Sequence, residues 1–369
     1  MDNLLELTFG ELKNSFIANN VQPSRAYPVF GWIYRRSVFD FEQMTDLPKD
    51  LRPMLKDWYK VIELEPVEEQ ADPSGESVKF LFRTYDGHYI ESVLLQGGEI
   101  DDETETLGPE RLTVCVSSQI GCPLGCNFCA TGRLDYKRNL SAGEIVSQIL
   151  LMDRYAKKKY KRETPGRAVT NIVFMGMGEP LLNFENVMKA IGILAFSGGF
   201  HIGARHITIS TAGIAPKIKE LAEIGLQIRL AVSLNSVNQE KRKVLMPVAR
   251  THSVNNILDA VKYYQQHIDR RITFEYVLLN GINSQEEDVL AMKRSLQGIK
   301  FHLNLIRYNP VDEIPLSPPT DEEYRHFKGF LRKHGIPFVE RFGKGREIAA
   351  ACGQLGLCKL DERLAKSKS

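Results

Sequence analysis

The sequence has no long apolar run, little net charge and few cysteines outside one short segment. No stretch of its 369 residues is apolar for long enough to span a bilayer, and the first twenty residues lack the uninterrupted core of a signal peptide. A net charge of +2 neither requires nor excludes a nucleic-acid partner. We therefore expect a cytoplasmic protein, where clustered cysteines indicate metal binding or redox catalysis rather than structural disulfides.

The composition, 43% hydrophobic and 25% charged, allows a full-sized core and predicts one large domain with a smaller one. From Thr113 onward, short apolar runs alternate with longer helical segments, which predicts parallel βα units closed or partly closed into a barrel. Chemistry in such barrels lies at the carboxyl ends of the strands. The predicted strands are 113–117, 170–176, 206–210, 228–235, 272–281 and 302–310.

The chain before this barrel divides into two parts. Residues 1–72 have apolar residues at helical spacing, interrupted by prolines, and predict several short helices. Arginines there are interleaved with aromatic residues, which fits either a solvated basic face or an RNA-contacting module. Residues 73–100 alternate apolar and polar side chains around a turn at Asp86 and Gly87, which predicts a β-hairpin.

Four of the six cysteines lie in CVSSQIGCPLGCNFCATG, residues 115–132, and Cys122, Cys126 and Cys129 form a C-x3-C-x2-C pattern there. A structural zinc site takes four protein ligands, usually as two separated pairs, and no second pair follows. An iron-sulfur cube held by three cysteines instead leaves one iron open for a small ligand. The spacing favours such a cluster over zinc or over buried thiols that bind nothing.

This pattern after the first barrel strand resembles the radical S-adenosylmethionine superfamily. Together with FMGMGEPLLN, NLIRYNP and AACGQL, it is similar to the RlmN/Cfr family of RNA adenosine methyltransferases over nearly the whole chain. The resemblance implies an α/β fold, a partial (β/α)6 barrel, with a small N-terminal helical domain and a β-hairpin extension. The predicted units are an RNA-binding accessory domain (1–72), the hairpin (73–100), the barrel (101–345) and a C-terminal segment (346–369).

The resemblance also implies a [4Fe–4S] cluster on the three cysteines, with S-adenosylmethionine on the open iron. Cys352 matches the cysteine that is methylated and carries the methyl group to the base, and Cys115 matches the cysteine that releases the RNA by forming a disulfide. Glu91 matches the residue that takes the ring proton. The remaining matches are contacts to S-adenosylmethionine: Gly178, Glu179, Ser210, Ser233, Leu234, Asn235 and Asn309. Taken singly, each of these residues also fits a structural role.

The implied reaction is methylation of carbon 2 of an adenosine in the peptidyl-transferase centre of 23S ribosomal RNA, with adenosine 37 of tRNA as a second implied substrate. A flavodoxin-type reductant and a monomeric enzyme are expected. Two residues depart from the pattern: Asn235 stands where the family usually has histidine, and Arg307 resembles Cfr, which leaves methylation at carbon 8 as an alternative. Cys358 matches no motif.

Two other classes share part of these features. A radical glycyl-activating enzyme would share the cluster but would need no pair of Cys115 and Cys352. A zinc-stabilised RNA-binding protein would share the basic helices, but its preparation would be colourless.

Overall fold

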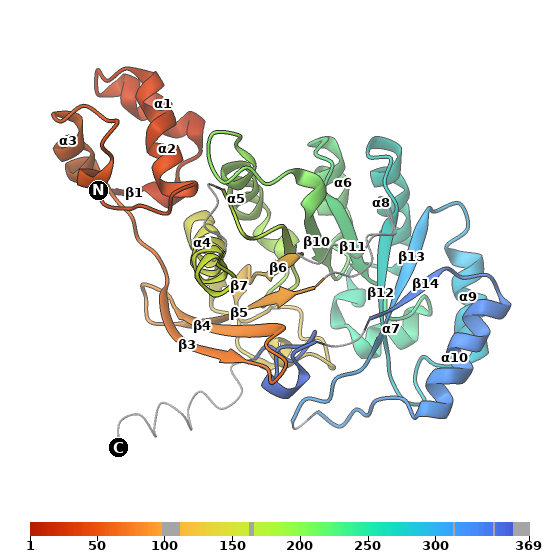
Figure 1. Cartoon of the computed structure of the whole chain (residues 1–369). Coiled ribbons are helices and arrows are strands. Elements are labelled where there is room, and N and C mark those ends of the chain that lie inside the picture. Colours follow the sequence, from red (N-terminus) through yellow and green to blue (C-terminus); the bar gives the residue numbers. More distant parts are fainter. Residues whose placement is uncertain (98–110, 162–165, 313, 342–343, 357–369) are drawn as a thin grey trace.

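The computed structural model describes residues 1–97, 111–161, 166–312, 314–341 and 344–356, so Cys358 lies outside the described residues. Its centre is a ten-stranded sheet in the order β14-β13-β12-β11-β10-β9-β6-β5-β4-β3 (Figure 1). All neighbouring strands from β6 to β14 are parallel, whereas those from β3 to β6 are antiparallel. The sheet thus joins a partial barrel to an antiparallel extension.

The parallel part confirms the predicted strands and adds one at the edge. Its strands are rich in Ile, Val, Leu and Phe because both faces of most of them are covered. β14 was not predicted because Phe338–Arg341 is short and half-exposed. The parallel strands are β6 (Leu112–Cys115), β9 (Asn171–Phe174), β10 (Ile207–Thr211), β11 (Arg229–Ser233), β12 (Ile272–Leu278), β13 (Phe301–Arg307) and β14 (Phe338–Arg341).

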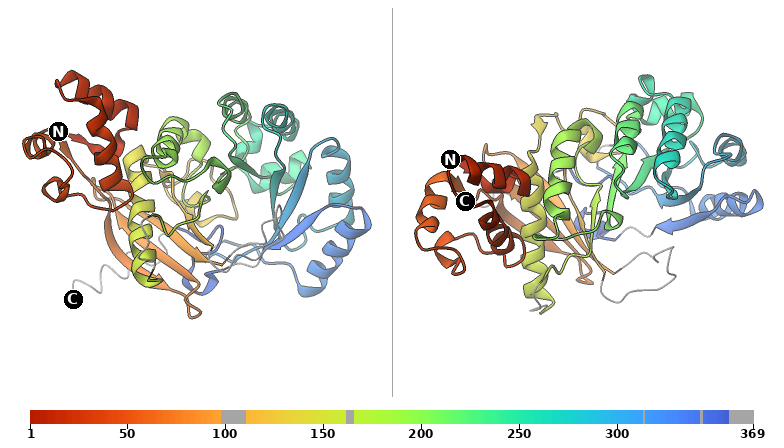
Figure 2. Two further views of the ribbon diagram at one scale, coloured as in Figure 1. Left: turned by 45° about the horizontal axis from the view of Figure 1, so that its top comes forward. Right: turned by 90° about the horizontal axis from the view of Figure 1, so that it is seen from above.

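Helices that connect these strands cover the outer side of the curved sheet (Figure 2). α4 shows why they form: Ser141 and Glu144 make a capping box at its start, and three lysines lie in its last turn, where cations suit the helix dipole. None of the helices in the described part of the chain is long and apolar enough to cross a membrane. The helices are α4 (Ala142–Lys159), α5 (Phe184–Ala195), α6 (Ala215–Glu223), α7 (Gln239–Leu245), α8 (Val254–His267), α9 (Glu286–Ser295) and α10 (Asp321–Lys333).

The antiparallel extension contains the predicted hairpin, formed by β4 (Ser77–Arg83) and β5 (Tyr89–Gln96). β3 (Glu65–Ala71) pairs with β4, so the expectation that the helical segment continues to residue 72 is wrong for these residues. β3 carries three glutamates and is mostly exposed, so its strand structure depends on pairing with β4 rather than on its own apolar pattern. The proposed unit boundaries themselves stay predictions.

The N-terminal helices are α1 (Phe9–Ala18), α2 (Ala26–Tyr34) and α3 (Leu51–Trp58); α1 and α2 lie beside the barrel helix α5, whereas α3 lies farther from the barrel (Figure 1). The Phe9 ring stacks on Phe196 with centroids 4.0 Å apart, and Lys189 forms an ion pair of 2.8 Å with Glu11. The helical segment is therefore fixed to the barrel by apolar and ionic contacts.

The arginines of this segment have two kinds of environment. The Arg35 guanidinium donates to the Gly199 carbonyl at 3.2 Å, and Arg52 donates to carbonyls within its own segment, so both have structural contacts. Arg36 is exposed and lies over the Trp32 ring, 4.0 Å from the centroid. Only part of the predicted basic face is thus available to a partner.

Candidate active site

The three clustered cysteines lie in the loop between the short strands β7 (Gln119–Ile120) and β8 (Arg138–Asn139). The loop is folded so tightly that two of its glycines leave no room for a side chain. A Cβ on Gly121 would lie 2.3 Å from the carbonyl oxygen of Asp135, and one on Gly132 would lie 2.8 Å from that of Cys126. The glycines therefore permit the close turns that bring the thiols to one place.

Each of the three thiols has a raised pKa, chiefly because burial disfavours the thiolate; for Cys122 it rises to about 12. The thiolates of Cys122 and Cys129 and the carboxylate of Glu179 raise the pKa of Cys126 further, whereas the Arg242 guanidinium lowers it. Iron would replace these protons, since thiolate is the form that binds metal.

Three thiols in one loop are the ligand set that an iron-sulfur cube with one open iron requires. Among the described residues, no three His, Cys, Asp or Glu side chains are close enough together to hold one metal ion. A zinc site needs its ligands around one centre, whereas each thiolate on an iron-sulfur cube binds a separate iron. Cys129 raises the pKa of Cys122, and both of these thiols raise the pKa of Cys126, which is consistent with three neighbouring thiols in one loop.

Glu179 follows β9 and is buried. Its two carboxylate oxygens accept from the backbone N–H groups of Ala212 at 2.7 Å and Leu181 at 3.0 Å, while burial raises its pKa to about 7. Gly178 has a φ of +98°, and a Cβ there would lie 2.5 Å from that of Gln119. The backbone must therefore pass close to Gln119 to place the Glu179 carboxylate.

The other predicted cofactor residues lie at the ends of β10 and β11. Ser210 and Ser233 are half-buried, and Leu234 is fully buried. The side chain of Asn235 accepts from the Val277 N–H at 2.9 Å and donates to the Met246 sulfur at 3.2 Å. Asparagine at this position thus already has protein partners for both ends of its amide.

Asn309, after β13, connects the predicted cofactor site with the segment that carries Cys352. Its Nδ2 donates to the Cys352 carbonyl at 3.2 Å, while its Oδ1 is buried and has no hydrogen-bond partner among the described residues. An unsatisfied buried acceptor of this kind suits a bound polar ligand. The donor and acceptor groups present here and on Glu179 fit S-adenosylmethionine.

The segment around Cys352 is held by contacts to the end of the cysteine loop. The Ala130 N–H donates to the Gly353 carbonyl at 2.8 Å, and the Thr131 hydroxyl donates to the Leu355 carbonyl. Gly353 has a φ of +83°, a conformation that glycine adopts readily. These bonds fix the backbone that directly follows Cys352, whose side chain is exposed.

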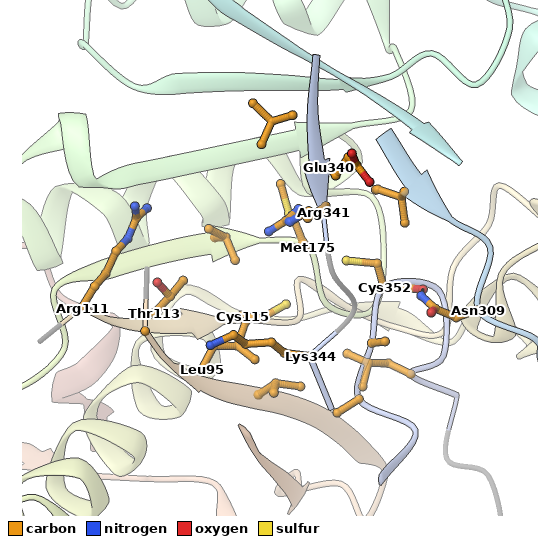
Figure 3. A pocket seen from close by; sticks show the side chains of 18 residues that line it. Leu95, Arg111, Thr113, Cys115, Met175, Asn309, Glu340, Arg341, Lys344 and Cys352 are labelled. Carbon is orange, nitrogen blue, oxygen red and sulfur yellow. Dashed lines mark hydrogen bonds between the residues drawn. The ribbon is translucent and has the colours of Figure 1, made fainter. Parts of the chain in front are cut away.

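Cys115 and Cys352 share one cavity of about 320 Å³, into which the sulfur atoms of both point (Figure 3). Cys115 is on β6, and burial raises its pKa to about 12, with a further rise from Cys352 and a lowering by the Arg341 guanidinium. Three cationic side chains, Arg111, Arg341 and Lys344, also line the cavity. Glu340 lines it as well, and Lys344 lies 2.9 Å from Glu76. The fold therefore brings together the two cysteines that the family resemblance pairs, in a cavity with more cationic than anionic side chains in its lining.

Glu91 is buried on β5, two residues before Val93, which lines this cavity. Its Oε1 lies 3.2 Å from Nζ of Lys79, and its Oε2 accepts from the Gly356 N–H at 2.9 Å. The carboxylate thus contacts both the hairpin and the Cys352 segment. The sequence analysis did not single out Lys79. The turn at Asp86 and Gly87 could have identified it, because this turn sets the hairpin register and so places Lys79 and Glu91 on the same face of the sheet.

Comparisons with known proteins agree with this geometry. The family model described as Radical SAM superfamily matches residues 116–292, and the one described as Ribosomal RNA large subunit methyltransferase N-terminal domain matches residues 2–61. The crystal structure of a radical SAM methyltransferase from Sphaerobacter thermophilus has a TM-score of 0.87 and 41% sequence identity, and the match covers 96% of this chain and 99% of that one. Fold and site thus define a radical SAM enzyme, a class that uses a [4Fe–4S] cluster and S-adenosylmethionine.

Curated relatives identify the family within this class. The probable dual-specificity RNA methyltransferase RlmN of Thermotoga neapolitana is 41% identical over 357 residues, which are 97% of this chain and 98% of that protein. The dual-specificity RNA methyltransferase RlmN of Campylobacter lari is 41% identical over 358 residues, 96% of this chain and 97% of that protein. The chain belongs to the RlmN family of radical SAM RNA methyltransferases, which confirms the resemblance, the fold class and the cofactors predicted from the sequence.

Proposed function

We propose that this enzyme methylates carbon 2 of an adenosine in 23S ribosomal RNA, and an adenosine of tRNA as a second substrate, by way of a methyl group carried on Cys352. The observation that carries the proposal is that Cys115 and Cys352 point their sulfurs into the same cavity (Figure 3). A reaction through a thiol-bound intermediate that is released by forming a disulfide requires such a pair.

Cys122, Cys126 and Cys129 would hold the cluster, and Glu179 and Asn309 would bind S-adenosylmethionine. When bound, these groups supply a methyl group and a carbon radical strong enough to remove a hydrogen atom from a methyl group. The Glu179 carboxylate, held by two backbone N–H groups, suits the cofactor's ammonium group. Ser210, Ser233, Leu234 and Asn235, at the ends of β10 and β11, would supply the remaining contacts to the cofactor.

The chain's own groups then make and break bonds to the base. Once a hydrogen atom has been removed from the methyl group on Cys352, the resulting carbon radical would bond to the adenine ring. Restoring the aromatic ring then requires loss of the ring proton, which Glu91 would take, and of one electron, which the cluster held by Cys122, Cys126 and Cys129 would accept. The Cys115 thiolate attacks the Cys352 sulfur; the new S–S bond forms as the bond from sulfur to the carried carbon breaks, and that carbon keeps the electron pair and gains a proton. The disulfide must be reduced before the next turnover.

Arg307, whose presence in the sequence favoured methylation at carbon 8, does not line the cavity that holds Cys115 and Cys352. Its guanidinium pairs with Asp321 on α10 at 2.5 Å and lies 5.1 Å from the centroid of the Tyr324 ring. Its neighbour Ile306 lines the cavity instead. These contacts give Arg307 a structural role and support carbon 2.

RNA binding is supported by the cations of the cavity and by exposed Arg36 on Trp32, a pair suited to phosphates and bases. We expect the enzyme to act as a monomer in the cytoplasm, with electrons from a flavodoxin-type protein.

The test is anaerobic incubation of reconstituted enzyme with labelled S-adenosylmethionine, a reductant and unmodified ribosomal RNA or tRNA, followed by mass spectrometry of the nucleosides. The proposal predicts 2-methyladenosine. Formation of 8-methyladenosine would overturn the assigned position of methylation. If Cys352 becomes methylated but the RNA stays unmodified, the assignment of these RNAs as substrates would be wrong.

A further inference from the structure

Arg242 on α7 is the largest fully buried side chain in the described part of the chain, and its known partners are all backbone carbonyls. Nε donates to Leu234 O at 3.1 Å, and Nη2 donates to Ala212 O at 2.5 Å and to Ser233 O at 3.2 Å. Nη1 is buried with no hydrogen-bond partner among the described residues. A buried cation is costly unless a negative charge offsets it, so this position calls for an anion.

The position of α7 shows where that anion lies. Asn127, directly after Cys126, donates its backbone N–H to Leu245 O at 3.0 Å and its side-chain amide to Val244 O at 2.5 Å. These bonds tie the cysteine loop to the carboxyl end of α7. Arg242 lies close enough to Cys126 that each group shifts the pKa of the other. The helix that carries the buried guanidinium thus packs on the cysteine loop, next to Cys126.

We propose that Arg242 is a positioning residue for the iron-sulfur cluster, whose buried positive charge makes the cluster easier to reduce. This inference rests on the proposed attachment of the cluster to Cys126. Three thiolates outweigh the core charge of the oxidised cluster, and the one electron that enters on reduction adds a further negative charge without making or breaking a bond. A fixed cation in the low-dielectric interior stabilises the more negative, reduced form.

The same guanidinium joins the ends of β10 and β11, so a purely structural role is the competing explanation. Three substitutions separate charge from hydrogen bonding. Arg242→Met removes both, Arg242→Gln removes the charge but keeps a polar head, and Arg242→Lys keeps the charge but loses the planar fork. Lys243→Met is the matched control, because Lys243 is on the same helix, 37% exposed and paired with Glu240.

The measurement is a potentiometric titration of each anaerobically reconstituted protein with dithionite and redox mediators, followed by electron paramagnetic resonance, with iron content determined in parallel. We expect Arg242→Met and Arg242→Gln to bind the cluster with an about tenfold lower ratio of reduced to oxidised form at a given potential, which is about 59 mV for one electron. Arg242→Lys and Lys243→Met should stay near the wild-type value.

Unchanged potentials in Arg242→Met and Arg242→Gln would overturn the inference, and so would a potential in Arg242→Lys that falls as far as in Arg242→Gln. If Arg242→Met does not fold, the comparison of Gln with Lys decides, since both retain a polar head. Failure of the wild-type protein to take up iron would overturn the proposed cluster, a result distinct from any change among the variants.

Discussion

Nζ of Lys79 lies 3.2 Å from Oε1 of Glu91, and the two side chains form a buried ion pair across the β4–β5 hairpin. Leu81 stands opposite Glu91 in the register, so the pair is diagonal on one face of the sheet. Glu91, which we expect to act as the base, therefore has the ammonium group of Lys79 as a direct neighbour.

Substitution Lys79→Met should lower the free energy of unfolding by about 3 kcal/mol, because it leaves the Glu91 carboxylate buried without its ammonium partner. Urea unfolding of the protein measures this. The double variant Lys79→Met/Glu91→Leu is the control: it should recover most of the loss, since removing both charges removes the penalty. Additive losses in the double variant would show that the pair is not coupled.

Substitution Glu91→Gln should separate the two halves of the reaction. The amide cannot take the ring proton, so methylation of RNA should fall by about 100-fold or more. Methylation of Cys352 does not need this base and should continue. Intact-protein mass spectrometry follows the first event and nucleoside analysis the second; a parallel loss of both would contradict the role of Glu91.

Substitution Cys115→Ala should permit attack on the base but block release, because no thiolate remains in the cavity to attack the Cys352 sulfur. We expect a covalent protein–RNA adduct that is visible on a denaturing gel and is removed by nuclease digestion. Cys352→Ala provides the control, since it removes the methyl carrier and should give no adduct. An intact cluster and cofactor without any adduct in Cys115→Ala would show that Cys115 has another function.

Release of the RNA should become faster as the pH rises. Burial raises the pKa of Cys115 to about 12, so its thiolate fraction grows about tenfold with each pH unit through the neutral and mildly alkaline range. Arg341 lowers this pKa, and Arg341→Met should therefore slow release at a given pH. Single-turnover experiments between pH 7 and 9 measure the slope; a flat profile would mean that thiolate formation does not limit release.

Local patterns were enough to predict most of the fold. The apolar runs of β6 and β9 to β13 and the turn of the hairpin predicted strands that the structure confirms. β3 and β14 were missed because their residues are polar or half-exposed and gain strand structure by pairing with a neighbour. Edge strands of this kind depend on contacts that are distant in sequence.

The site was predictable where a motif carries the chemistry and less so where tertiary contacts do. The cysteine spacing indicated the cluster, and the resemblance supplied Cys115 and Cys352. Arg242 was not singled out, because an arginine in a helix with many charged neighbours suggests an exposed face. Its burial arises only when α7 packs on the cysteine loop.

The bonds from Ala130 and Thr131 to the Cys352 segment also have a consequence for maturation of the enzyme in the cell. The ribosome makes the cysteine loop long before it makes Cys352, since 224 residues separate Thr131 from Leu355. Once translated, the later segment packs directly on the end of that loop. We therefore expect iron delivery to be easiest while the segment is still being synthesised, so that the timing of translation favours a cluster in place before the methyl carrier arrives.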